Sequence, residues 1–318
     1  MASVLFDIMP LPQNDSENPV VRIKYTPAFE EAMGRFRALL VRGELGERGL
    51  QVTADVIEVN AANYTAWAYR RRCLEDIGSR EVWERELAWS GEITQANQKN
   101  YQVWFHRRRC VEVLATGDAA ELEFIAECLE EDAKNYHAWG YRQWLLRHFQ
   151  LWTDELGFTA SLVKEDPHNN SAWNQRFFVF KETGALADAG AVALELEYAQ
   201  AQLRRDPHNS APWNYIKGLV EAAPKELLLK KGAGAAALTV DGADAEIWLT
   251  AYCRSVLAAQ VGCVPAAGVL VDLCEKRGSA ETLTEGAALC LALATKWDTI
   301  RSKYWAMRQA QLSSSAAA

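Results

Sequence analysis

The chain has 318 residues, of which 49% are hydrophobic and 24% are charged, and its formal net charge is -8. This acidic balance disfavours general nucleic-acid binding, which depends on basic side chains that neutralise phosphates. No uninterrupted apolar run reaches the roughly eighteen residues that a membrane span needs, so we expect no membrane span.

Residues 1–30 are expected to form an extended N-terminal segment. Prolines and acidic residues interrupt its first part and no basic region precedes them, so it does not have the pattern of a secretory signal. The seven cysteines are an odd number and form no CxxC pair, which favours buried free thiols in a reducing compartment. These features together predict a cytoplasmic protein.

The main repeats occupy residues 31–223 and are aligned by a tryptophan. The intervals between successive tryptophans run from 34 to 40 residues, a period typical of stacked helical hairpins, and the tryptophans are Trp67, Trp104, Trp139, Trp173 and Trp213. The first four are each followed three residues later by an arginine, which shares a helix face with its tryptophan; these are Arg70, Arg107, Arg142 and Arg176. Asparagine is a favoured N-cap, and helix starts are therefore expected at Asn63, Asn100, Asn135 and Asn170.

The second half of each copy is also expected to be helical, because apolar residues recur along one helix face. After the main repeats we expect a Gly/Ala-rich loop over 224–245, degenerate repeats over 246–311 and a disordered tail over 312–318. The sequence thus predicts an all-α fold, a curved layer of helical hairpins in a single domain over 1–318.

The repeated tryptophans and arginines, including the arginine clusters at 70–72 and 107–109, are ascribed mainly to structure. A repeated Trp usually packs between neighbouring hairpins, and a repeated Arg usually binds a carboxylate or the carbonyls of an adjacent unit. The clusters could alternatively bind phosphate or an acidic group. Neither HExxH, CxxC, a Gly-rich phosphate loop nor a GxSxG elbow is present, so we expect no zinc site made by this chain alone.

The functional hypothesis depends on the positions at which the copies differ. Tyrosines follow the opening asparagine in the first three copies, at Tyr64, Tyr101 and Tyr136, and lysines precede it in the second and third, at Lys99 and Lys134. Helix starts attract anions through free N–H groups and the helix dipole. A lysine and two tyrosine hydroxyls at neighbouring helix starts therefore predict a phosphate-binding edge, and the alternative is a solvated loop.

Long, distinctive stretches of the chain match a known family. They include PLPQNDSENPVVRIKYTPAF, NAANYTAW, KNYQVWFHRRR, DAKNYHAWGYRQWLL and PHNSAPWNYIKG. On these stretches the chain resembles the α subunit shared by protein farnesyltransferase and protein geranylgeranyltransferase type I. The resemblance covers most of the chain and implies a crescent-shaped, right-handed superhelix of helical hairpins that wraps around a β subunit.

The resemblance also implies an activity, which needs that β subunit. A farnesyl or geranylgeranyl group is transferred from its diphosphate to the cysteine thiol of a C-terminal CaaX sequence, on proteins such as Ras-like and Rho-like GTPases. Zinc would be bound by the β subunit and not by this chain, and Mg²⁺ is implied for farnesyltransferase.

Four residues acquire diphosphate-binding roles from the resemblance. Lys99 matches the catalytic lysine of the family, whose ammonium stabilises charge growing on the departing diphosphate. Tyr101 matches a catalytic tyrosine beside that diphosphate. Tyr136 and His137 match residues of the same anion-binding edge.

Two more residues are assigned to the peptide substrate. Gln102 matches the glutamine that hydrogen-bonds the C-terminal carboxylate of the CaaX sequence, and Tyr64 matches a residue that lines the peptide pocket. The chain departs from the family at Phe105 and Gly140, where other members often carry polar residues. Two alternatives stay open, the α subunit of Rab geranylgeranyltransferase and a non-catalytic scaffold like the tetratricopeptide proteins.

Overall fold

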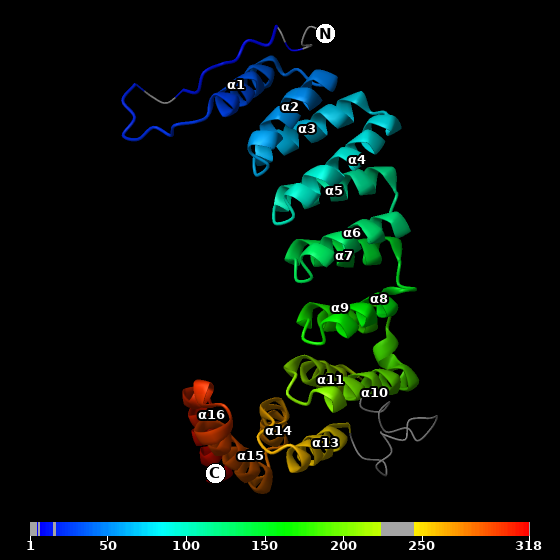
Figure 1. Ribbon diagram of the computed structural model, residues 1–318, viewed down its shortest axis with the longest axis vertical. Coiled ribbons are helices and arrows are strands. Elements are labelled where there is room, and N and C mark those ends of the chain that lie inside the picture. The colour runs from blue at the N-terminus through cyan, green and yellow to red at the C-terminus, as the bar shows by residue number, and fades with distance from the viewer. Residues whose placement is uncertain (1–4, 6, 15–16, 224–244, 318) are drawn as a thin grey trace. The chain divides into compact units, whose positions relative to one another are not determined.

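The computed structural model describes residues 5, 7–14, 17–223 and 245–317 (Figure 1). Over these ranges the chain is built of helices and contains no strand, so the predicted all-α fold is confirmed. The predicted loop at 224–245 lies, except for Ala245, outside the described residues. Two compact units divide the chain, Met1–Leu151 and Trp152–Ala318, and the single domain expected over 1–318 stays a prediction.

The first unit is a series of antiparallel helical hairpins. Figure 1 shows the pairs α2–α3, α4–α5 and α6–α7 following one another along the unit, and the two helices of each pair are in contact. The helices are α1 (Pro27–Arg42), α2 (Glu47–Val59), α3 (Tyr64–Ile77), α4 (Arg80–Ala96), α5 (Tyr101–Leu114), α6 (Ala119–Glu131) and α7 (Tyr136–Phe149).

The second unit is also built of helices, including the described part of the predicted degenerate repeats. Its α-helices are α8 (Glu155–Glu165), α9 (Asn170–Glu182), α10 (Ala189–Arg205), α11 (Ser210–Ala222), α13 (Ala245–Ala259), α14 (Val264–Arg277), α15 (Ala280–Ala292) and α16 (Ser302–Ala317). It also contains three short helical segments, the 3₁₀ helices η1 (Ala185–Ala187) and η3 (Thr299–Arg301) and the π-helix η2 (Leu293–Trp297).

Asparagine side chains cap the second helix of each main hairpin. The Oδ1 atom of Asn135, for example, accepts the amide N–H of His137 at 2.9 Å, which satisfies a backbone donor that the helix cannot. The prediction for the fourth copy is wrong by one residue, because Asn169 is the cap and Asn170 is the first helical residue. Asn169 Oδ1 is the acceptor that reaches the amide of Ser171, at 3.1 Å.

The repeated tryptophans anchor each hairpin, as predicted. In all five copies the indole N–H donates to the backbone carbonyl six residues earlier, at distances of 2.7 to 3.0 Å. All five rings are buried, and Trp67 has no exposed surface. Each ring therefore fills the space between hairpins while its one polar atom is bonded to the preceding loop.

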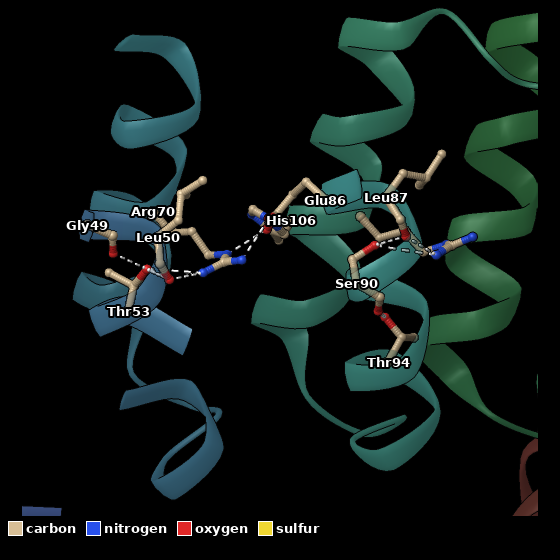
Figure 2. A network of polar contacts seen from close by, with 10 residues as sticks. Gly49, Leu50, Thr53, Arg70, Glu86, Leu87, Ser90, Thr94 and His106 are labelled. Atoms are coloured by element: carbon tan, nitrogen blue, oxygen red, sulfur yellow. Dashed lines mark hydrogen bonds and ion pairs between the residues drawn. The ribbon is translucent and has the colours of Figure 1, made fainter. Parts of the chain in front are cut away.

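In three of the copies the arginine joins successive helices through a buried carboxylate. Arg70 on α3 donates from Nε and Nη2 to the two carboxylate oxygens of Glu86 on α4, at 2.6 and 2.7 Å (Figure 2). His106 on α5 places its Nε2 atom 2.6 Å from the same carboxylate. Two further sets repeat this arrangement, Arg107–Glu121–Tyr141 and Arg176–Glu195–Tyr215. The structural role predicted for the leading arginine of each cluster is confirmed.

Two predicted boundaries are wrong. The extended N-terminal segment ends before residue 30, because Thr26 caps α1 with its Oγ1 atom and Pro27 suits the first helical position. The tail over 312–318, predicted to be disordered, instead continues α16 through Ala317. Leu312 is only 2% exposed, and its buried contacts with α15, where Gly286 leaves room, hold the end of the helix.

Candidate functional site

The candidate residues lie where α3, α5 and α7 begin. Tyr64, Tyr101 and Tyr136 are the first residues of these helices, and their exposed fractions are 71%, 69% and 75%. Helix α5 contacts both α3 and α7, so the three helix starts succeed one another along one edge of the first unit. Core packing does not require these large rings, because they are mostly in solvent.

Tyr101, Tyr136 and His137 come together across the starts of α5 and α7. The ring centroids of Tyr101 and His137 are 4.2 Å apart, and the two rings meet edge to face at 87°. The Tyr136 ring also meets the same imidazole edge to face, with its centroid 5.6 Å away. The structure therefore brings these three side chains together, and the His137 ring is in contact with both tyrosines.

The environment of His137 favours its neutral form. Burial lowers the pKa of the imidazole below 6.5, and a hydrogen bond between the ring and the backbone of Lys99 only partly opposes this shift. At neutral pH the ring therefore carries no charge, and its single N–H donates to the backbone carbonyl of Lys99, which leaves the other ring nitrogen as an acceptor. The positive charge at this edge must come from lysine.

Lys99 supplies that charge immediately before the cap of α5. Its side chain is 84% exposed, and its Nζ atom lies 3.5 Å from the Oδ2 atom of Asp132, which follows α6. Both residues line a hollow of about 620 Å³ between the loop before α5 and the end of α6. Because the ammonium is exposed and paired with only one carboxylate in the described structure, an incoming anion can reach it.

Gln102 and Tyr64 are less closely associated with the cluster formed by Lys99, Tyr101, Tyr136 and His137. Gln102 is half-buried in the first turn of α5, where its backbone N–H donates to Asn100 Oδ1 at 2.9 Å. Within the described residues, no hydrogen bond or ring contact joins the side chains of Gln102 and Tyr64 to the Lys99 group. The structure thus places both on the same edge but does not bring them into the cluster.

The cluster has the groups that a phosphate requires. The Lys99 ammonium is a point charge, the Tyr101 and Tyr136 hydroxyls can each donate one hydrogen bond, and the His137 ring can donate from its second nitrogen when it is protonated. The N-terminal dipoles of α5 and α7 add partial positive charge at the same edge. The chemistry that this arrangement supports is binding of a diphosphate or a similar anion, which favours the phosphate-binding edge over a solvated loop.

Sequence reasoning missed Asp132. It ends α6 at a position where the loops of other copies carry Asn60, Asp166 or Asp206, so it resembles an ordinary turn residue. Its 3.5 Å approach to Lys99 depends on how adjacent hairpins stack. The only signal in the sequence is that an acidic residue stands two positions before Lys134 in one of the tyrosine-bearing copies.

Comparisons with known proteins show the family to which the chain belongs. The protein prenyltransferase alpha subunit repeat matches residues 47–77, 83–114, 118–149, 152–183 and 192–223. The chain is 33% identical to the protein farnesyltransferase/geranylgeranyltransferase type-1 subunit alpha of Dictyostelium discoideum over 304 residues, which cover 94% of this chain and 89% of that protein. The chain therefore belongs to the protein prenyltransferase alpha-subunit family.

Other relatives match over shorter stretches. The subunit of the same name from Schizosaccharomyces pombe is 40% identical over 139 residues, which cover 44% of this chain and 35% of that protein. The subunit from Solanum lycopersicum is 47% identical over 72 residues, so the match covers 23% of this chain and only 21% of that protein. High local identity is thus confined to parts of the chain.

The fold also matches a solved structure. A chain of Candida albicans protein geranylgeranyltransferase-I, complexed with GGPP, superposes with a TM-score of 0.79 at 28% identity, and the match covers 96% of this chain and 97% of that one. Among the described helices, none is long and apolar enough to cross a membrane.

Proposed function

We propose that this chain is the α subunit of a heterodimeric protein farnesyltransferase and geranylgeranyltransferase type I. The donor is farnesyl or geranylgeranyl diphosphate, and the acceptor is the cysteine thiol of a CaaX protein, such as a Ras-like or Rho-like GTPase. Activity requires a β subunit. The observation that supports this proposal most is the anion-binding edge, because family members named for this activity match the chain and the edge carries suitable groups for a diphosphate.

The reaction forms a carbon–sulfur bond and breaks a carbon–oxygen bond. The cysteine thiolate attacks C1 of the isoprenoid, and the diphosphate leaves with the electron pair of the C1–O bond. Lys99 and Tyr101 stabilise the negative charge that grows on the departing oxygen, while Tyr136 and His137 hold the diphosphate. Since the ammonium interacts most strongly with the fully developed charge, it lowers the barrier more than it strengthens substrate binding.

The other two predicted residues bind the peptide. Gln102 donates from its side-chain amide to the C-terminal carboxylate of the CaaX sequence, and Tyr64 lines the peptide pocket. Both residues lie in the first turn of a helix on the same edge as Lys99, and the exposed Tyr64 ring is available to a bound peptide. A peptide carboxylate and the diphosphate would thus lie at neighbouring positions of one surface.

The metals belong to the partner in this proposal. In the part of the chain that the structure describes, no group of three or more His, Cys, Asp or Glu residues could hold a metal ion. Zinc is assigned to the β subunit, Mg²⁺ is not assigned to residues of this chain, and no step is attributed here to either ion. We place the enzyme in the cytoplasm, because its seven cysteines are unpaired, as expected in a reducing compartment.

The replacement Lys99→Ala tests the proposal in the assembled heterodimer. The single-turnover rate of isoprenoid transfer should fall by roughly 10²–10³-fold, the effect of removing one transition-state donor. The dissociation constant of the isoprenoid diphosphate should change much less. Lys134→Ala is the matched comparison, since Lys134 precedes the cap of α7 as Lys99 precedes that of α5, and it should slow transfer far less.

An unchanged single-turnover rate in the Lys99→Ala enzyme would remove the catalytic role of this lysine. A wild-type enzyme that transfers only to a Rab protein presented with an escort protein would instead favour the Rab geranylgeranyltransferase alternative. The tetratricopeptide-like scaffold is disfavoured by the match to prenyltransferase repeats.

A further inference from the structure

Asp132 is the carboxylate that faces Lys99, and its own position is fixed. Its Oδ1 atom accepts the backbone N–H of Lys134 at 3.3 Å, and its backbone N–H donates to the Cys128 carbonyl at 3.1 Å. Its carbonyl accepts the N–H of Asn135 at 2.9 Å. The other carboxylate oxygen, Oδ2, is directed to the Lys99 ammonium, 3.5 Å away. A fixed anion therefore stands beside a lysine whose side chain is largely in solvent.

The loop itself does not require a negative charge at this position. In the first copy Asn60 occupies the same place, and its Oδ1 atom accepts the N–H of Ala62 at 3.1 Å in the same type of turn. The second acidic residue of the hollow, Glu131, accepts a hydrogen bond from Gln98 at 2.6 Å. Asp132 is thus the carboxylate whose charge is directed at Lys99, while the turn alone would be satisfied by an amide.

We propose that Asp132 is a positioning residue that holds the Lys99 ammonium at the edge and offsets its attraction for the bound diphosphate before reaction. This inference rests on the proposed function. Before transfer, the ammonium is shared between Asp132 and the diphosphate. As negative charge grows on the leaving diphosphate, the ammonium moves toward it and away from Asp132.

The consequence is that Lys99 contributes more to the transition state than to substrate binding. An interaction accelerates the chemical step only if it is stronger in the transition state than in the bound substrate. Without the Asp132 charge, Lys99 would bind the ground-state diphosphate more tightly, with no matching gain in the transition state. Tighter binding would then be accompanied by slower chemistry.

The test uses Asp132→Asn in the assembled heterodimer, because Asn60 shows that an amide can make the turn. The inhibition constant of inorganic diphosphate should fall about five- to sevenfold, as expected for one unit charge removed at 3.5 Å in a water-like dielectric. The single-turnover rate at saturating isoprenoid diphosphate should fall by a similar factor, so that the ratio of rate to dissociation constant stays nearly constant. Both effects should shrink as salt is raised, since exposed charges are screened.

Asp206→Asn provides the matched control. Asp206 ends α10 at the same position of its copy, makes the same turn with the N–H of His208 at 3.0 Å, and faces His168 at 3.3 Å. Its replacement should leave both constants unchanged, because it lies in the second unit and outside the proposed diphosphate site. A second control places Asp132→Asn in a Lys99→Ala background, where its effect on the inhibition constant should disappear.

Each other outcome overturns the inference. These outcomes are unchanged constants in Asp132→Asn, equal changes in Asp206→Asn, an effect that persists without Lys99, and a variant that fails to assemble with the β subunit. The last would show that the fold itself needs the Asp132 carboxylate. The failure of the proposed function is distinguishable, because the wild-type heterodimer would then transfer no isoprenoid at all.

Discussion

The buried pair between Arg70 and Glu86 provides a quantitative test of the architecture. The side chains are 6% and 3% exposed, and the guanidinium makes two hydrogen bonds to the carboxylate. Glu86→Gln keeps the shape of the side chain but removes its charge. It also replaces one carboxylate oxygen by an NH₂ group, so that an N–H of Arg70 faces another donor in place of an acceptor. Removing one partner of such a pair costs about 3–5 kcal/mol, because the other charge is left buried and uncompensated.

The matched control lies one half-turn earlier on the same helix. Glu84 pairs with Arg80 at 2.8 Å, but these side chains are 52% and 60% exposed. Glu84→Gln should therefore cost at most about 0.5 kcal/mol, as solvent-exposed helix pairs do. The two variants change the same residue type in the same way, so the difference between them reports burial alone.

Amide hydrogen exchange is the appropriate assay, because the chain contains two compact units and a single global unfolding energy would combine them. Exchange from α3, α4 and α5 should accelerate strongly in Glu86→Gln and hardly at all in Glu84→Gln. A loss of less than about 1 kcal/mol in Glu86→Gln would refute the view that this carboxylate holds three helices together, because the expected cost of breaking a buried pair is several times larger.

Burial lowers the pKa of His106 below 6.5, while its hydrogen bond to Glu86 opposes the shift. The unfolded chain therefore binds more protons than the folded chain below pH 6.5, and the stability of α3–α5, measured by hydrogen exchange, should fall as the pH drops below that value. The variant His106→Gln should weaken this dependence. Glutamine fits the position, because Gln175 at the same place in another copy donates its side-chain N–H to Glu155. At the C-terminus, Leu312→Ala should destabilise α15–α16 by about 2–5 kcal/mol, as removal of a buried leucine does, whereas Met307→Ala, at a residue 51% exposed, should have little effect on exchange there.

The repeats could be predicted because they depend on local chemistry. The asparagine cap and the tryptophan recur at the same spacing in successive copies, so each copy supports the interpretation of the others. Their hydrogen bonds are local, from the indole to the carbonyl six residues earlier and from the first backbone amides of the helix to the asparagine. The carboxylate partners were not predictable in this way. Glu86 lies sixteen residues from Arg70 but Glu195 lies nineteen from Arg176, so the spacing varies with hairpin length.

The candidate site shows the same division. The residue types at Lys99, Tyr101 and His137 were evident from the differences between copies, because a copy needs none of them for its core. The contact between Tyr101 and His137 and the pairing of Lys99 with Asp132 join different hairpins. Their geometry depends on how α5, α6 and α7 stack, which one sequence does not specify. The end of α16 was mispredicted because a Ser/Ala-rich tail is compatible with both disorder and helix.

We propose that this chain acts as one half of a prenyltransferase. The most direct measurement is isoprenoid transfer to a CaaX peptide by this chain alone, by a farnesyltransferase-type β subunit alone, and by the two together. We predict transfer only in the mixture. A stable complex of the two subunits that transfers neither farnesyl nor geranylgeranyl would contradict the claim, since the shared architecture would then be present without the activity.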